Sequence, residues 1–191
     1  MRCLIALDRD GTVNVERNYL SSPDQLELLP GVVEGIRALR VLGCAIVVVT
    51  NQSAVARGFI DSTQLDRIHE RLQELLRDQG VQVDAFFVCP HMPDAECRCR
   101  KPGTLLLEEA VQAHGLEEGY VVVIGDQASD IEMGHRFGAA TMLVLTGYGE
   151  RTLKEGRVQP DYVVTDLVEA AAIVGNHLQV IAPAASGAHD E

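Results

Sequence analysis

The sequence is poor in basic residues. It has 16 Lys and Arg against 28 Asp and Glu, which gives its 191 residues a formal net charge of −12. Proteins that bind nucleic acid or anionic membranes need many basic side chains to displace counterions, so the charge argues against both classes of partner. A small anionic substrate is compatible with this charge, because the field inside a site is set by its nearest charges.

Long hydrophobic runs are also missing. The longest are short segments such as 45–49 and 120–124, whereas a membrane-spanning helix needs about 20 apolar residues. The first residues lack the basic start, the long apolar stretch and the small-residue cleavage site of an export signal. We therefore expect a cytoplasmic protein without a membrane role.

Cysteine is scarce, with five residues in the chain. An odd number does not suit a disulfide framework, and the crowding of Cys89, Cys97 and Cys99 suggests metal ligation instead. Cys3 and Cys44 lie in strand-like runs, where we expect them to be buried as small hydrophobic residues.

The rest of the composition is that of a globular protein, with 47% apolar and 23% charged residues, and its length suits one domain. Short apolar runs alternate with segments of helical period, which indicates βαβ units around a mainly parallel sheet. The runs are mostly continuous and β-branched, as strands buried on both faces should be. The expected strands are 3–7, 44–49, 85–88, 120–124, 141–145 and 162–164.

Four segments between these strands repeat apolar residues at intervals of three and four, so that each has one face to bury. These expected helices are 32–42, 65–76, 105–113 and 131–137. A glycine follows each of them, where a left-handed residue commonly ends a helix; the four are Gly43, Gly80, Gly115 and Gly138. The small and polar residues 180–191 are expected to form a disordered tail, which leaves 1–179 as the domain.

Polar residues follow three of the expected strands. In open parallel sheets, ligands bind beyond the carboxyl ends of the strands, so segments 8–12, 50–53 and 125–130 are expected to converge on one crevice. Three or four carboxylates gathered there would repel one another unless a cation held them. Hard divalent ions prefer such oxygen ligands, and the sequence therefore predicts a Mg²⁺ site.

These segments resemble the motifs of the haloacid-dehalogenase superfamily. Asp-x-Asp-Gly-Thr at 8–12, Thr50 after a second strand, Lys101 before a helix and Gly-Asp-x-x-x-Asp at 125–130 look like its four motifs in order. A lone Asp-x-Asp is more often a solvated turn or a helix cap, but one function explains all four motifs together. The resemblance implies an α/β fold with a three-layer, Rossmann-like core and the hydrolysis of phosphomonoesters.

The resemblance also implies a role for each carboxylate. Asp8 would attack phosphorus and become an aspartyl phosphate. Asp10 would serve first as general acid and then as general base. Mg²⁺ would lie between the Asp8 carboxylate, the backbone carbonyl of Asp10 and Asp126, with Asp130 in a supporting position.

Two further motifs would hold the phosphoryl oxygens. The hydroxyl of Thr50 and the backbone amides after it would donate hydrogen bonds, and Lys101 would add a positive charge that stabilises both the phosphoryl group and Asp8. Gly11 would permit the tight turn after the nucleophile, and Thr12 would cap or buttress that turn.

A second constellation supplies four potential metal ligands within one short loop, namely Cys89, His91, Cys97 and Cys99. Sulfur and nitrogen ligands at this spacing suit tetrahedral Zn²⁺, and we interpret loop 89–99 as a closed, structural site. The alternative is a set of reduced cysteines beside a surface histidine. The loop leads directly into Arg100 and Lys101, so zinc binding and catalysis are expected to be coupled.

The zinc loop narrows the resemblance to the histidinol-phosphatase-like branch, whose members have no large cap domain. Two of its families compete. Residues 50–58, Thr-Asn-Gln-Ser-Ala-Val-Ala-Arg-Gly, resemble a stretch of the D-glycero-D-manno-heptose-1,7-bisphosphate 7-phosphatases, whereas histidinol-phosphate phosphatases usually diverge after the Gln. Gln127 stands where the heptose family usually has a substrate-binding Lys, which would weaken one phosphate contact and leaves the substrate open.

The expected partner is a small phosphorylated metabolite, with a sugar phosphate favoured, and the protein is expected to be a monomer. The resemblance implies a set of substrate-binding residues: Glu16, Arg17, Asn18, Tyr19, Thr50, Asn51, Gln52, Ser53, Arg100 and Lys101. A zinc-organised module that binds a phosphorylated ligand without turnover is the alternative from another class.

The remaining histidines receive no function. His69 lies on an expected helix and is interpreted as pointing to solvent. His114 and His135 lie near helix ends, where histidine is common.

Overall fold

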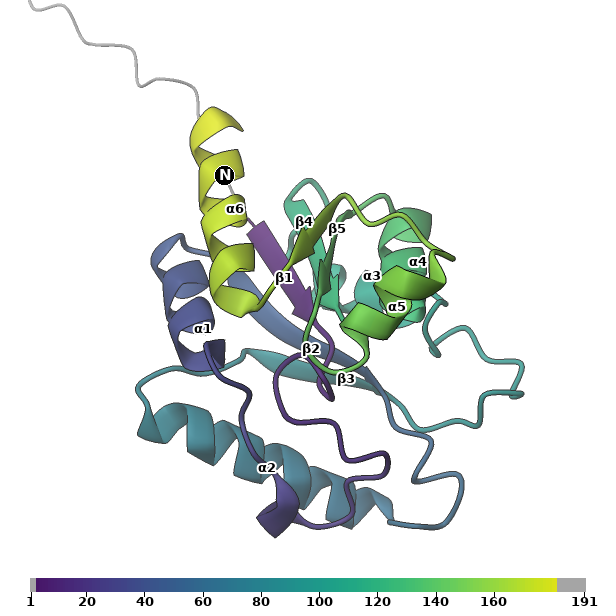
Figure 1. Ribbon diagram of the computed structural model, residues 1–191. Coiled ribbons are helices and arrows are strands. Elements are labelled where there is room, and N and C mark those ends of the chain that lie inside the picture. The colour runs from purple at the N-terminus through teal and green to yellow at the C-terminus, as the bar shows by residue number, and fades with distance from the viewer. Residues whose placement is uncertain (1–2, 182–191) are drawn as a thin grey trace, which may run out of the picture.

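The computed structural model describes residues 3–181. Its centre is a parallel sheet of six strands in the order β3-β2-β1-β4-β5-β6 (Figure 1). The strands are β1 Cys3–Leu7, β2 Ala45–Asn51, β3 Ala85–Cys89, β4 Tyr120–Gly125, β5 Ala140–Val144 and β6 Tyr162–Val164. All six lie where the apolar runs predicted them, within two residues at each end.

Helices cover both faces of the sheet, so the domain has three layers (Figure 1). The helices are α1 Val32–Val41, α2 Ser62–Asp78, α3 Leu105–Ala113, α4 Ala128–Phe137, α5 Gly149–Glu155 and α6 Leu167–Ile181. The first four were predicted, and the glycine after each of them has a positive φ between 60° and 84°. Helices α5 and α6 were not predicted.

Strand β1 is apolar at every position because both of its faces are buried. Successive side chains of a strand point to opposite faces. Cys3, Ile5 and Leu7 join the hydrophobic cluster under α1, α2 and α6, while Leu4 and Ala6 join the cluster under α3 and α4. Each face of this central strand is therefore covered, and the predicted burial of Cys3 is confirmed at 2% exposure, the same value as Cys44.

The strand order places a switch point beside β1. The chain leaves β1 toward β2 and β3 on one side, and then returns to β4 on the other side. Loops diverge at such a point and leave a crevice at the carboxyl ends of the strands. The long loops 8–31 and 90–104 border this crevice. The first of them contains the short 3₁₀ helix η1, Pro23–Gln25, and two isolated β-bridges. No large cap domain is inserted in this part of the chain.

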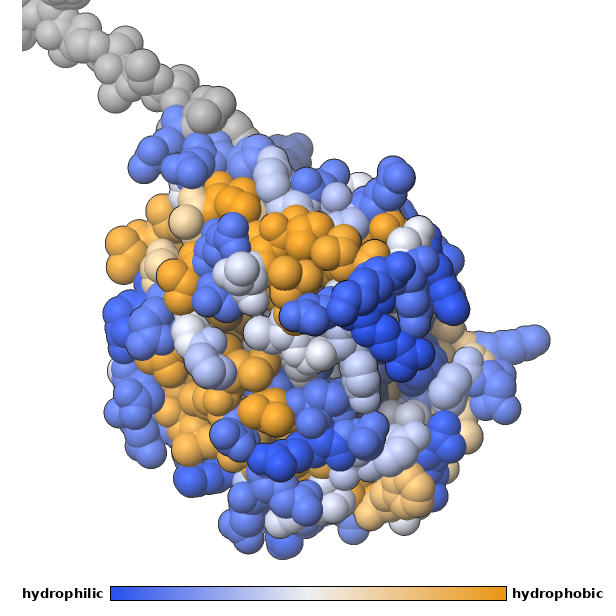
Figure 2. All heavy atoms as spheres, in the orientation of Figure 1, coloured by the Kyte–Doolittle hydropathy of each residue, from blue (hydrophilic) through white to orange (hydrophobic). Residues whose placement is uncertain are grey.

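The surface is mixed. In the view of Figure 2, hydrophilic residues dominate the lower and right-hand parts, and apolar residues gather toward the side of α1 and α6. Val41 of α1 and Val168 of α6 are among the exposed large apolar residues. None of the helices within residues 3–181 has the length and apolar composition needed to cross a membrane.

The predicted tail falls mostly outside the structure. Residues 180 and 181 are the last two of helix α6. Residues 182–191 lie outside the described part of the chain, and the prediction of disorder for them stays a prediction.

Candidate active site

Three buried carboxylates meet where β1 and β4 end. Asp8 follows β1, Asp126 follows β4, and Asp130 lies in the first turn of α4. The Asp8 amide donates a hydrogen bond of 2.9 Å to the carbonyl of Ile124, which holds the two strand ends together. Carboxylate oxygens from the three aspartates lie within 4.8 Å of one another. Like charges at this separation repel strongly when they are buried, so the group requires cations.

Lys101 supplies one of these cations. Its Nζ lies 2.6 Å from an oxygen of Asp8 and 2.6 Å from an oxygen of Asp130, and it also donates to the carbonyl of Val49 at 2.8 Å. The Asn51 side chain fixes the Lys101 backbone, because its amide donates to the Lys101 carbonyl and its oxygen accepts from the Lys101 amide. Lys101 is thus anchored at both its backbone and its charged end.

One ammonium group does not balance three carboxylates. Burial raises the pKa of Asp8 to about 7, although Lys101 lowers it. Burial, followed by the charges of Asp8 and Asp130, raises the pKa of Asp126 to about 9. The buried Oδ1 atom of Asp126 has no hydrogen-bond partner in the described part of the chain. A hard dication bound to oxygen ligands would satisfy both the charge and the orphaned oxygen.

The residues therefore fit Mg²⁺. Asp8 and Asp126 would hold it, together with the predicted backbone carbonyl of Asp10. Asp130 is engaged elsewhere, since one of its oxygens contacts Lys101 and the other accepts from the Gln127 amide at 3.0 Å. This placement supports the predicted auxiliary role of Asp130.

Two glycines make room beside Asp126. Gly11 has a φ of +83°, and Gly147 has a φ of +55°. A Cβ atom at either position would lie about 2.1–2.2 Å from Asp126 Oδ2, so no other residue fits without displacing the carboxylate. The positive φ of Gly11 agrees with the tight turn that was predicted after the nucleophile, Asp8.

Mg²⁺ is expected to stabilise the protein more at pH 8 than at pH 6. Without metal, the pKa values of Asp8 and Asp126 in the folded protein lie above the ordinary value of 3.8. The folded state therefore binds more protons than the unfolded state, and the stability of the metal-free protein falls as pH rises from about 4 through about 7 and 9. Mg²⁺ at about 100 times its Kd should add about 2.7 kcal/mol, or roughly 5–10 °C in Tm. Thermal scans at both pH values test this, and an equal shift at pH 6 and 8, or an undiminished shift in Asp126→Asn, contradicts it.

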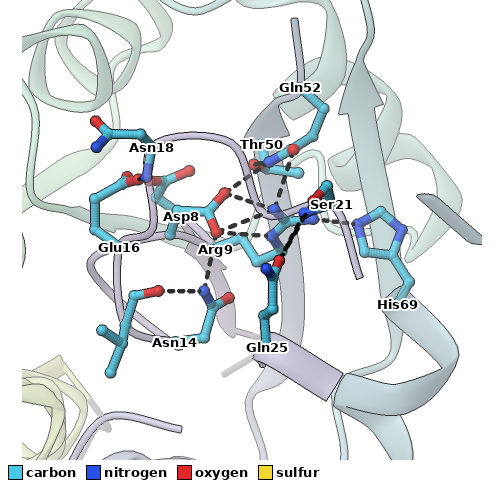
Figure 3. A network of polar contacts seen from close by, with 12 residues as sticks. Asp8, Arg9, Asn14, Glu16, Asn18, Ser21, Gln25, Thr50, Gln52 and His69 are labelled. Atoms are coloured by element: carbon cyan, nitrogen blue, oxygen red, sulfur yellow. Dashed lines mark hydrogen bonds and ion pairs between the residues drawn. The ribbon is translucent and has the colours of Figure 1, made fainter. Parts of the chain in front are cut away.

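The carboxylate of Asp10 is held by a network of donors, among them the Arg9, Asn14 and Gln52 side chains that Figure 3 labels. Arg9 donates to both of its oxygens at 2.7–3.2 Å, Asn14 donates at 2.9 Å, and the Gln52 amide donates at 2.8 Å. The same Gln52 nitrogen lies 2.8 Å from the Thr50 hydroxyl. Burial raises the pKa of Asp10, but the charge of Arg9 and these hydrogen bonds outweigh burial and hold the pKa below its ordinary value. Asp10 is therefore ionised at neutral pH.

The prediction that His69 points to solvent was wrong. The residue is 8% exposed, and its Nε2 lies 3.2 Å from Nη1 of Arg9. Its ring stacks on Phe86 with centroids 4.5 Å apart. A signal was present in the sequence, because His69 follows Leu65 by four positions and precedes Leu72 by three, which places it on the buried face of α2.

A cavity of about 390 Å³ opens above these groups. It is lined by nine of the residues predicted to bind substrate: Glu16, Asn18, Tyr19, Thr50, Asn51, Gln52, Ser53, Arg100 and Lys101. Arg17 is not among the lining residues; it pairs with Glu27 at 2.7 Å. Gln127, Ser129 and Tyr148 also line the cavity, and the last two were not predicted.

Tyr148 connects the two sides of the cavity mouth. Its amide donates to Asp126 at 2.7 Å, and its hydroxyl donates to the Asn18 side chain at 3.1 Å. Asn18 has a φ of +62°, and its amide donates to the carboxylate of Glu16. The loop after β1 is thus tied to the loop after β5 across the entrance, a contact between distant segments that the sequence did not indicate.

The four predicted zinc ligands come together at the end of β3, which Cys89 closes, and in the loop that follows it. Cys89 Sγ lies 3.2 Å from Cys99 Sγ, 3.8 Å from Cys97 Sγ and 3.5 Å from His91 Nδ1, and all four ligand atoms lie within 4.8 Å of one another. A tetrahedron with Zn–S bonds of about 2.3 Å has edges of about 3.8 Å. The donor set and its spacing therefore fit a structural zinc ion.

Removal of zinc is expected to lower the phosphatase activity predicted from the sequence by roughly tenfold or more, because the loop positions Arg100 and Lys101. Arg100 donates to the carbonyl of His91 at 3.2 Å, and Lys101 follows directly. Dialysis against a strong chelator, with metal content and activity measured before and after Zn²⁺ is restored, tests this coupling. Cys99→Ala should reproduce the loss, whereas Cys44→Ala, outside the cluster, should not; full activity in the zinc-free protein would contradict the coupling.

Several known proteins are similar to this chain. A family model described as HAD-hydrolase-like matches residues 98–170. D-glycero-beta-D-manno-heptose-1,7-bisphosphate 7-phosphatase of Bordetella bronchiseptica is 38% identical over 154 residues, which cover 80% of this chain and 86% of that protein. The enzyme of the same name from Pseudomonas aeruginosa is 35% identical over 172 residues, which cover 90% of this chain and 97% of that protein.

Solved structures of enzymes from the same family are also similar to this chain. The crystal structure of D,D-heptose 1,7-bisphosphate phosphatase from B. bronchiseptica, in complex with magnesium and phosphate, matches with a TM-score of 0.85 and 36% identity over 91% of this chain and 98% of that one. The corresponding enzyme from Burkholderia thailandensis matches with a TM-score of 0.65 and 32% identity over 90% and 97%. This chain is therefore a phosphatase that belongs to the haloacid-dehalogenase-like hydrolases and, within them, to the family of the D-glycero-D-manno-heptose-1,7-bisphosphate 7-phosphatases.

Proposed function

We propose that the protein removes the 7-phosphate of D-glycero-D-manno-heptose 1,7-bisphosphate through an aspartyl phosphate on Asp8. The observation that carries this proposal is the position of Asp8. Its carboxylate is buried at the base of the cavity, 2.6 Å from Lys101 Nζ, and shares a possible cation site with Asp126. A carboxylate in such surroundings can remain ionised and attack an anionic phosphoryl group.

In the first half of the reaction, an oxygen of Asp8 forms a bond to phosphorus while the bond from phosphorus to the sugar oxygen breaks. Lys101 and the Thr50 hydroxyl stabilise negative charge on the phosphoryl oxygens. Bound Mg²⁺ would supply a Lewis acid for these oxygens and neutralise the carboxylates that hold it. The departing sugar oxygen takes its proton from Asp10.

Asp10 needs a proton for this role, although it is ionised in the free protein. A phosphoryl group beside Asp10 brings further negative charge, and like charges raise the pKa of a carboxyl group. Substrate binding thus favours the protonated, acidic form. In the second half, the ionised Asp10 takes a proton from water, the water oxygen attacks phosphorus, and inorganic phosphate leaves as the Asp8 carboxylate is restored.

The cavity lining supports a sugar substrate. Asn18, Ser53 and Gln127 offer neutral hydrogen-bonding groups that suit hydroxyls, and Arg100 offers a cation for a second phosphate. Histidinol phosphate remains the second candidate, because the Glu16 carboxylate at the same cavity would suit its ammonium group.

A comparison of kcat/KM for heptose 1,7-bisphosphate and histidinol phosphate, with Mg²⁺ present, tests the proposal. We expect the bisphosphate to be preferred by at least roughly tenfold, the discrimination that one charged contact supplies. A preference for histidinol phosphate would overturn the substrate assignment. Binding of either compound without turnover would overturn the proposed reaction and favour the non-catalytic alternative.

We further propose that the protein works in the cytoplasm as a monomer, without nucleic-acid or membrane partners. The net charge of −12 supports the second part of this proposal. Light scattering coupled to size-exclusion chromatography tests the oligomeric state.

A further inference from the structure

Arg9 lies directly behind the active site and is 0% exposed. A guanidinium group only donates hydrogen bonds, and buried donors that lack an acceptor are costly. Its Nε and Nη2 atoms are used by Asp10, and Nη2 also reaches the Gln52 side-chain oxygen at 3.0 Å. The remaining nitrogen, Nη1, faces His69 of α2 (Figure 3).

His69 provides the acceptor for that nitrogen. Because Arg9 cannot accept, the His69 Nε2 atom, 3.2 Å from Nη1, must be unprotonated, and the proton of the neutral ring must lie on Nδ1. Burial, and then the charge of Arg9, lower the pKa of His69 to about 3, which keeps the ring in this state. Stacking on Phe86, with ring planes 12° apart, fixes the direction of the lone pair.

The guanidinium is therefore held on two sides, by His69 at Nη1 and by the carboxylate at Nε and Nη2. We propose that His69 is a positioning residue for the phosphatase reaction and that it acts through Arg9 to orient the carboxylate of Asp10. This inference rests on the proposed role of Asp10 as general acid and base. His69 is not among the residues that line the active-site cavity.

Loss of the acceptor has a definite consequence. Without it, a buried N–H of Arg9 would lack a partner, and the guanidinium would turn to find another one. The carboxylate of Asp10, whose side chain is 18% exposed, has room to follow. A displacement of about 1 Å at a reacting group can lower a rate by about 10²-fold.

Two variants separate this effect from packing. His69→Phe keeps a flat ring against Phe86 but removes the acceptor. His69→Gln places an amide oxygen near the former position of Nε2 and restores the acceptor on a residue that suits a helix. The measurement is kcat/KM in Mg²⁺ for two substrates, heptose 1,7-bisphosphate and p-nitrophenyl phosphate. This ratio reports the first phosphoryl transfer, where the sugar oxygen needs a proton on leaving and p-nitrophenolate does not.

We expect His69→Phe to lower kcat/KM for the sugar bisphosphate by roughly 10- to 100-fold, with little change for p-nitrophenyl phosphate, and His69→Gln to recover most of the loss. His114→Phe, a ring exchange at the end of α3, should leave both values unchanged. An equal loss on both substrates, or no loss on either, would overturn the proposal, because a purely structural role does not depend on the leaving group.

A crystal structure of His69→Phe decides the matter independently of turnover. We expect the contact between Arg9 and Asp10 to be rearranged, and an unchanged fork between them would overturn the proposal. If the wild-type protein releases no phosphate from either substrate, the proposed function fails, and this structural comparison still tests the link from His69 to Asp10.

Discussion

Asp8→Asn is expected to abolish phosphate release, with kcat reduced by about 10⁴-fold or more. The amide has nearly the same shape as the carboxylate, but it is a far weaker nucleophile and carries no charge to direct toward phosphorus. Acid-quenched reactions should contain a covalent phosphoprotein for the wild-type chain and none for the variant. Steady-state phosphate release and this trapping experiment together check the prediction.

The fold of this variant should survive, for electrostatic reasons. Burial already disfavours the charged form of Asp8, whose pKa is raised to about 7, and a neutral side chain relieves repulsion with Asp126 and Asp130. Lys101 keeps its contact of 2.6 Å with Asp130. The Tm should therefore stay within about 4 °C of the wild-type value, equivalent to roughly 1 kcal/mol. Asp66→Asn, at an exposed position of α2, is the matched control and should remain fully active; turnover by Asp8→Asn would refute covalent catalysis.

The positions of the strands along the chain and of four helices could be predicted, because buried parallel strands carry a strong apolar signal and helices that bury one face repeat apolar residues at intervals of three and four. The ends of β2 could not. Residues Thr50 and Asn51 belong to the strand because their backbones pair with Val88 and Cys89 of β3. Such backbone pairing cannot be read from hydropathy. Helix α5, with seven residues, is too short for periodicity to distinguish it from a loop.

The residues of the candidate site that directly follow strands could be predicted from the sequence. Asp8 and Asp126 follow neighbouring strands, so topology alone brings them together. Arg9 and His69 are 60 positions apart, and their contact depends on how α2 packs across the sheet. The apolar spacing in the sequence indicates which face of α2 buries His69, but it does not indicate that Arg9 lies against that face.

Lys101→Met is expected to lower kcat/KM by about 10²- to 10³-fold at neutral pH, the cost of removing one preorganised charge from a phosphoryl site. The loss has a second cause. The charge of Lys101 lowers the pKa of Asp8, so its removal raises that pKa further above 7 and leaves more of the nucleophile protonated. The remaining activity of the variant should therefore rise from pH 7 to pH 9, because Asp8 ionises over this range. The rise should be steeper than that of the wild-type enzyme.

The chain offers a matched control for this experiment. Its other lysine, Lys154, lies on α5 with a side chain that is 78% exposed and 3.6 Å from Glu150, so Lys154→Met should change neither rate nor pH profile. Lys101→Arg keeps the charge but replaces a compact ammonium by a larger, planar fork, so we expect it to alter the 2.6 Å contacts that Lys101 Nζ makes with Asp8 and Asp130. We expect this variant to keep the cationic charge that lowers the pKa of Asp8, and with it the wild-type pH profile, yet to recover little of the rate. Recovery of full activity in Lys101→Arg would mean that charge alone, and not its placement between the two carboxylates, drives the reaction.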